Sequence, residues 1–111
     1  MFDADGPIPF DIRLEPHRER LHVVPTGELD LLTAPRLESA LLEAFDNGFQ
    51  HVVADLRELG FIDSSGIRVL WQAHARAERD RVRLSLMTGA GDVWRALRMT
   101  GLLDTMHLIE R

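Results

Sequence analysis

The 111-residue sequence contains no cysteine and no lysine. The lack of cysteine excludes disulfides, thiolate catalysis, iron–sulfur clusters and cysteine-ligated zinc. All 13 basic residues are arginines, which indicates GC-rich coding rather than a chemical requirement. Acidic residues number 18, and the net charge of −5 argues against non-specific nucleic-acid binding, because that function needs a basic excess to neutralise phosphates.

Long apolar runs are also missing from the sequence. The longest run has three residues, as in Val69-Leu70-Trp71, so we expect no membrane-spanning segment. The first twelve residues include three aspartates and no basic residue, so we expect no secretory signal. With 45% apolar and 28% charged residues, the composition is typical of one globular domain, and a cytoplasmic location is predicted.

The N-terminal third predicts a loose arm followed by a β-hairpin. Residues 1–9 contain two prolines and a glycine and predict a flexible arm. Residues 10–14 alternate apolar and polar side chains, as a half-buried strand does, and residues 15–20 predict the turn. Residues 21–26 predict the second strand, whose Pro25 suits a sheet edge or a strand end because proline cannot donate to the ladder. A loop is expected next, at residues 27–30.

The rest of the chain predicts alternating helices and strands. The expected elements are a helix from Thr33 to Asn47, a strand at 51–56, a loop up to 62, a helix at 64–78, a strand at 82–86 and a helix from 93 to Gly101. Residues 105–109 fit either a strand or a short helix. Strands joined by helical crossovers pair in parallel. The sequence therefore predicts a single-domain α/β fold over residues 10–111. Its mixed sheet has four to five strands with helices packed on it, in the order β-β-α-β-α-β-α.

Two adjacent serines at a predicted helix start are the most informative local feature. Ser64 and Ser65 follow Asp63 and precede Gly66, which leaves the approach to the serines uncrowded. A helix start has unpaired N–H groups and a positive dipole end, so it tolerates a covalent phosphate. Plain helix capping is the alternative, since Ser and Asp are common N-caps. The residues alone favour capping over phosphorylation.

Enzyme chemistry finds little support in the motifs. A nucleophilic serine needs a base and an oxyanion hole, and the Gly-x-Ser-x-Gly pattern is absent around Ser64. Asp63 as a magnesium ligand or phosphoryl acceptor would need further acids and usually a lysine. The glycines at 89–91 fail the dinucleotide fingerprint, whose third glycine would fall at Trp94. No spacing implicates any of the five histidines, which are His17, His22, His51, His74 and His107.

Several segments, in a fixed order, resemble one known family. They are Gly27-Glu28-Leu29-Asp30 with Thr33-Ala34, Asp55-Leu56 with Leu59, Phe61-Ile62-Asp63-Ser64-Ser65-Gly66-Ile67, and Gly101-Leu102. Together they are similar to the STAS domain of bacterial anti-sigma factor antagonists, over nearly the whole chain from about residue 10. The Asp-Ser-Ser-Gly motif alone is weak, but the order and spacing of all these segments within a chain of this length make the resemblance strong.

The resemblance implies a partner-switching regulator without a cofactor and without enzymatic activity. In this family the unmodified antagonist binds an anti-sigma factor that is also a serine/threonine kinase, and this binding frees the sigma factor. The kinase phosphorylates the serine after the motif aspartate, here Ser64, and the interaction ends. A serine phosphatase resets the switch. Neither nucleic acid nor membrane is an expected partner, and a weak homodimer is left open.

The resemblance also assigns a contact surface near Ser64, to which the turn around Asp30 should lie close. We expect the helix N–H groups and dipole to accept the phosphate without refolding of the helix. The added charge should then make the contact surface repel the partner. A STAS module serving as a fixed scaffold in a stress-signalling or transport complex is the alternative. The expected partner-binding residues are Glu28, Asp30, Thr33, Asp63, Ser64, Ser65, Gly66 and Arg68.

Overall fold

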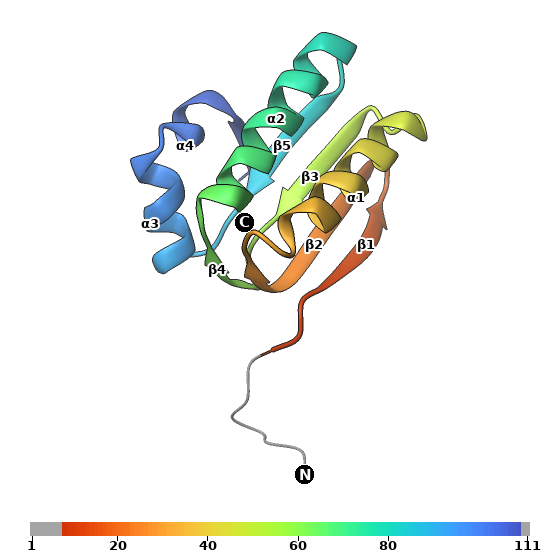
Figure 1. The fold of residues 1–111 in the computed structure, drawn as a ribbon. Coiled ribbons are helices and arrows are strands. Elements are labelled where there is room, and N and C mark those ends of the chain that lie inside the picture. The colour runs from red at the N-terminus through yellow and green to blue at the C-terminus, as the bar shows by residue number, and fades with distance from the viewer. Residues whose placement is uncertain (1–7, 110–111) are drawn as a thin grey trace.

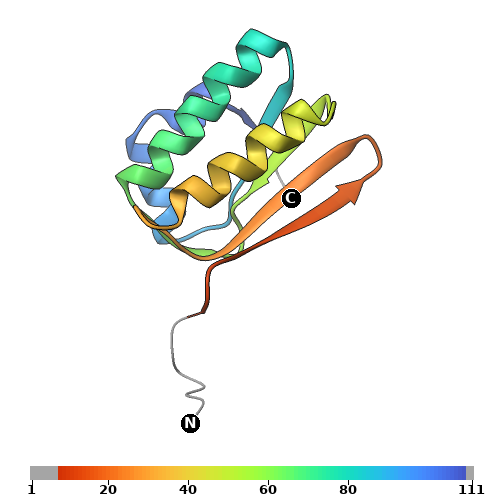
Figure 2. The same ribbon diagram turned by 45° about the vertical axis from the view of Figure 1, so that its right-hand side comes forward.

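One mixed sheet organises the molecule, and its two long helices cover the same face (Figures 1 and 2). The computed structural model describes residues 8–109; most of the predicted arm at residues 1–9 lies outside them. Strands β1 (Asp11–His17) and β2 (Arg20–Leu29) form an antiparallel hairpin. The other elements are α1 (Ala34–Asp46), β3 (His51–Asp55), β4 (Leu59–Ile62), α2 (Ser64–Asp80), β5 (Arg83–Met87), α3 (Asp92–Met99), α4 (Leu102–Thr105) and β6 (His107–Leu108).

The sheet has more strands than the sequence predicts. Within residues 8–109 it contains six, in the order β1-β2-β3-β5-β6, with β4 paired to β2. The predicted loop before residue 62 is wrong, since β4 forms there and pairs in parallel with the end of β2. The undecided segment at 105–109 contains both the end of α4 and the two-residue strand β6. The predicted α/β class, mixed sheet and packed helices are confirmed.

Strand β2 is longer and more central than predicted because it changes neighbours along its length. Its pairing with β3 stops at Val23, and its pairing with β4 starts at Gly27. Pro25 lies between these two ladders, so its missing N–H does not interrupt either. Pro25 is therefore at neither a sheet edge nor a strand end, because β2 lies between β1 and β3 and continues to Leu29. The expected loop at 27–30 is largely strand. The predicted hairpin is confirmed, but its turn is shorter than residues 15–20, since only Arg18 and Glu19 separate β1 from β2.

Gly27 is required where β2 bends between its two neighbours. Its φ is +86°, which is a left-handed conformation that favours glycine, and the register with β4 shifts at this residue. A Cβ atom at Gly27 would lie 2.9 Å from the Cα of Phe10. The chain entering β1 therefore crosses directly over this glycine, and the end of β2 is fixed in position beside β4.

The core lies between the sheet and helices α1 and α2. The apolar stripe of α1 faces this core, and its residues Leu37, Leu41 and Phe45 are buried. Burial of each such side chain contributes roughly 1.5–3 kcal/mol. No helix among residues 8–109 is long and apolar enough to cross a bilayer. The α2 and β5 residues facing the same core include Val69, Leu70, Ala73, Ala77, Leu84 and Leu86.

The opposite face of the sheet mixes polar side chains with the buried apolar residues Val24, Val53 and Met87. Side chains alternate between the faces of a strand, so His22, Asp55 and Ser85 project away from the helices while their neighbours fill the core. These three are the buried polar side chains within residues 8–109. His22 Nδ1 lies 3.2 Å from Asp55 Oδ2, and Arg57 donates to both oxygens of that carboxylate. This network links β2 to the end of β3.

Candidate functional site

The start of α2 presents an exposed serine hydroxyl. Asp63 is the N-cap, in an extended conformation, and its Oδ1 accepts hydrogen bonds from the N–H groups of Ser65 at 2.8 Å and Gly66 at 3.4 Å. The predicted cap is confirmed. Ser64 is the first residue of α2 and is exposed. Its hydroxyl forms no hydrogen bond within residues 8–109, so it is free to react with an incoming group.

The occupied cap changes how a phosphate on Ser64 would be accommodated. We expected the helix N–H groups to receive it, but the Asp63 carboxylate already accepts from two of them. A phosphate could bind these N–H groups only by displacing a carboxylate of the same charge. Because Ser64 is exposed, a phosphate there would add negative charge to the surface.

The turn between β2 and α1 is held by its own polar side chains. Asp30 Oδ1 accepts from the N–H groups of Leu32 at 3.0 Å and Thr33 at 3.1 Å. Thr33 occupies the N-cap position of α1, but its side chain makes no cap hydrogen bond to the helix. Its hydroxyl donates to the Glu28 carbonyl at 2.7 Å and accepts from the Asp30 N–H at 2.9 Å. Asp30 and Thr33 therefore fix the shape of this turn.

Strand β4 brings this turn next to the start of α2. Glu28 pairs with Phe61 in the ladder, and the Asp63 N–H donates to the Leu29 carbonyl at 3.1 Å. Residues separated by more than thirty positions thus meet at one end of the sheet, as expected for the Asp30 turn and Ser64. Arg68 is exposed one helical turn after Ser64, so it lies on the same side of α2.

Nearly the whole chain matches one known domain family. The sequence pattern that defines the STAS domain covers residues 11–111. The chain belongs to the STAS domain family. An anti-sigma-B factor antagonist from Staphylococcus aureus is 27% identical over 84 residues, which are 76% of this chain and 78% of that protein.

Solved structures share the fold of this STAS domain. An anti-sigma factor antagonist from Mycobacterium paratuberculosis matches with a TM-score of 0.84 at 24% identity, over 93% of this chain and 87% of that one. The antagonist SpoIIAA in its unphosphorylated form matches with a TM-score of 0.74 at 22% identity, over 91% and 90% of the two chains. Phosphorylated Bacillus SpoIIAA matches with a TM-score of 0.68 at 21% identity, over 91% and 93%.

Gly66 of the STAS domain has a packing role that differs from the expected one. It does not leave open space beside the serines, because it is buried. A Cβ atom there would lie 2.6 Å from Leu29 Cδ2 and 2.8 Å from Ile62 Cγ1. Glycine therefore lets the first turn of α2 pack closely against the ends of β2 and β4, which determines where Ser64 is presented.

Gly66→Ala is expected to lower the free energy of unfolding by about 1–3 kcal/mol, because overpacking of a filled site forces its neighbours to shift. Gly60→Ala is the matched control, since a Cβ at Gly60 would meet its nearest atom at 3.6 Å, an ordinary contact. Urea denaturation measures both variants. Equal stability of Gly66→Ala and wild type would show that Leu29 and Ile62 leave room for a methyl group at Gly66.

Exposed apolar side chains lie on the turn after β2 and on β4, the two segments next to the start of α2, and they were not predicted from the sequence. Leu31 is 73% exposed, Leu32 is 84% exposed and Phe61 is 45% exposed. A signal was available for the leucines, because they precede the helix and lie outside its buried stripe. Apolar side chains that are exposed close together are typical of protein contact surfaces.

The acidic side chains near Ser64 are unpaired, and the basic residue on the same side of α2 is Arg68, one helical turn away. Glu28, Asp30 and Asp63 form no salt bridge within residues 8–109. The hydroxyl of Ser64 meets no histidine in this part of the chain, so the nucleophile hypothesis lacks its base. The same residues contain no group of three acids or histidines placed to hold a metal ion. The surface is thus suited to a protein contact that responds to added negative charge.

Proposed function

We propose that this STAS domain is an anti-sigma factor antagonist whose contact with an anti-sigma factor serine/threonine kinase ends when Ser64 is phosphorylated. The observation that carries this proposal is an exposed, unpartnered hydroxyl at the first position of α2. Relatives named anti-sigma-B factor antagonists support the regulatory role. Binding of the unmodified form to the kinase frees the sigma factor, and a serine phosphatase restores that form.

The contact surface comprises the exposed residues around Ser64. Leu31, Leu32 and Phe61 supply apolar area, and each square ångström removed from water contributes about 25 cal/mol. The acidic side chains orient the partner and favour a basic surface on it. The proposed partner-binding residues are Glu28, Asp30, Thr33, Asp63, Ser64, Ser65, Gly66 and Arg68, of which Gly66 acts through helix position because it is buried.

Phosphorylation acts through surface charge in this proposal. A phosphoserine adds roughly 1.5–2 negative charges, and the Asp63 carboxylate already occupies the nearest N–H groups. The new charge therefore faces the partner beside Glu28, Asp30 and Asp63. The match of this fold to SpoIIAA in both its unphosphorylated and phosphorylated forms supports a switch that leaves the fold in place.

The decisive experiment is intact mass spectrometry after incubation with the cognate anti-sigma factor kinase and ATP. Wild type should gain one phosphate, mapped by peptide sequencing to Ser64, and Ser64→Ala should gain none. Ser65→Ala is the matched control and should be modified like wild type. Phosphate at another residue would refute the assignment. A stable multi-subunit complex with Ser64 unmodified would instead favour the fixed-scaffold alternative.

A further inference from the structure

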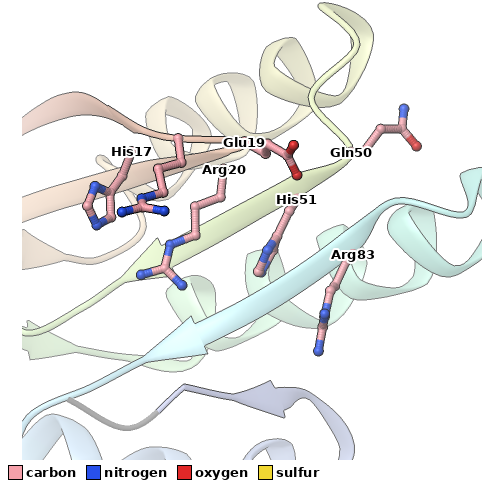
Figure 3. A pocket seen from close by; sticks show the side chains of 7 residues that line it. His17, Glu19, Arg20, Gln50, His51 and Arg83 are labelled. Atoms are coloured by element: carbon pink, nitrogen blue, oxygen red, sulfur yellow. The ribbon is translucent and has the colours of Figure 1, made fainter.

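A row of basic side chains crosses the helix-free face of the sheet. His17 of β1 pairs with Arg20 of β2, Arg20 pairs with His51 of β3, and His51 pairs with Arg83 of β5. Paired residues on neighbouring strands share a face and lie about 4.8 Å apart along the row. Figure 3 shows Arg20, His51 and Arg83 projecting in the same direction from three neighbouring strands. The four residues therefore form a continuous basic row.

The arginines of this row are not neutralised by carboxylates. Neither Arg20 nor Arg83 forms a salt bridge within residues 8–109, in contrast to Arg57 and Arg76 in the same protein. Arg83 donates one hydrogen bond, to His107 Nε2 at 2.9 Å, which leaves its other donors free. Glu19, in the hairpin turn, is the acid that borders the row. Unpaired arginines are notable here because the chain as a whole has a net charge of −5.

The row lines a hollow of ligand size. The hollow has a volume of about 900 Å³ and lies between the hairpin turn and the first residues of β3 and β5. A second hollow of about 360 Å³ shares His17 and Arg20 with it and is also lined by Glu15, His22 and Arg57, the last of which pairs with Asp55. His22 Nε2 is buried and has no hydrogen-bond partner in the described part of the chain. The two hollows thus adjoin along the open face of the sheet, and the row of basic side chains lines the larger one, which we call the groove.

The electrostatic environment of His51 supports a positive potential in the groove. Burial lowers the pKa of His51 below its usual value, and the charges of Arg83 and Arg20 lower it further, followed by those of His107 and His22. The guanidinium groups on β2 and β5 therefore act on the same point. An anion placed there would interact favourably with each of them.

We propose that this groove is a binding site for a compact oxyanion with two or more negative charges, of the diphosphate class, held by Arg20, His51 and Arg83. Two guanidinium groups flank the imidazole, and each presents several N–H donors suited to bidentate contact with phosphate oxygens. The site lies at the first residue of β2, whereas Ser64 is near the last residue of β2. The proposal therefore does not depend on the phosphorylation switch.

The lining of the groove favours recognition of charge over recognition of a base. Among the described residues that line the larger hollow are no phenylalanine and no tryptophan, and the apolar platform that a nucleobase would stack on is missing. The side chains that line it are arginine, histidine, glutamine and one glutamate. Pyrophosphate is thus the simplest probe of the site.

The test is a titration of the full chain with sodium pyrophosphate at low ionic strength. Calorimetry measures the affinity, and amide chemical shifts locate the site. We expect saturable binding, with the largest shifts at Arg20, His51 and Arg83. Arg20→Gln and Arg83→Gln should each weaken binding at least about tenfold, because each removes a charge-assisted contact. Arg20→Lys, which keeps the charge but loses the fork geometry, should lose less.

Control variants separate this site from general charge attraction. Arg98→Gln removes an exposed arginine that lies over Trp94 on α3 and should bind pyrophosphate like wild type. Ser64→Ala should also bind normally, which separates this proposal from the proposed switch. A nucleoside diphosphate should bind no more tightly than pyrophosphate. Absence of saturable binding, equal weakening by Arg98→Gln, or shifts centred on Ser64 would each overturn the proposal.

Discussion

Ser64→Asp is expected to weaken binding to the anti-sigma factor kinase on the order of 100-fold or more, whereas Ser64→Ala should bind like wild type. The aspartate places a negative charge among Glu28, Asp30 and Asp63, in a surface that must lose its water when the partner binds. The alanine removes a hydroxyl that makes no hydrogen bond within residues 8–109, so it leaves the contact intact. Calorimetry with the purified kinase domain measures both variants.

The position of the new charge should matter more than its presence. Gln50→Glu is the matched control, because it adds one charge at an exposed residue before β3, at the other end of the sheet. This variant should keep wild-type affinity. Amide spectra of Ser64→Asp should change only near the start of α2. Equal binding by all variants would refute the switch at Ser64, and a refolded α2 would refute its electrostatic mechanism.

Helices and caps of this domain are predictable from sequence because their determinants are local. The stripe of Leu37, Leu41 and Phe45 follows the helical repeat, and Asp63 caps the helix that begins at the next residue. Strand β4 is different, because its four residues contain a glycine and its partner is the end of β2. A short strand of this kind is defined by a pairing that lies more than thirty residues away, so no local pattern indicates it.

The same distinction applies to the candidate site. The exposed position of Ser64 follows from its place at a helix start, which the sequence indicates. The role of Gly66 does not, because its contacts are with Leu29 and Ile62 across a junction that only the folded chain forms. The row from His17 to Arg83 likewise depends on the register of four strands. Sequence patterns locate reactive groups, and the sheet topology determines which groups meet.

Asp55→Ala is expected to lower the free energy of unfolding by about 1–3 kcal/mol, the cost of leaving a buried polar group without its hydrogen-bond partner. The Asp55 side chain is 2% exposed and accepts from Arg57 at 2.9 and 2.8 Å. Its loss would leave His22 buried with both ring nitrogens unpartnered, since Nε2 already lacks a partner in the described residues. Urea denaturation at pH 7 measures the effect.

Two variants test whether the loss of stability in Asp55→Ala is caused by the buried position of the carboxylate. Asp92→Ala breaks an exposed ion pair with Arg95 and should change stability by less than about 1 kcal/mol. The double variant His22→Leu/Asp55→Val replaces both buried partners by apolar groups and should be more stable than Asp55→Ala alone. The double variant does not leave Arg57 as a buried unpaired charge, because its side chain is 40% exposed and can turn to solvent. A double variant that is less stable than Asp55→Ala would contradict this account.

The pH dependence of the stability difference between wild type and Asp55→Ala tests whether the charge on Asp55 causes that difference. Burial alone would raise the pKa of Asp55, but hydrogen bonds from Arg57 and then from His22 outweigh burial and hold the pKa below its usual value. A carboxyl whose pKa is lower in the folded state stabilises the fold at neutral pH, and this contribution is lost as the pH falls through the folded-state value. The stability gap between wild type and Asp55→Ala should therefore be full at pH 7 and should narrow as the pH falls below about 4. A gap that is unchanged in acid would mean that packing, and not the ionised carboxylate, accounts for the loss.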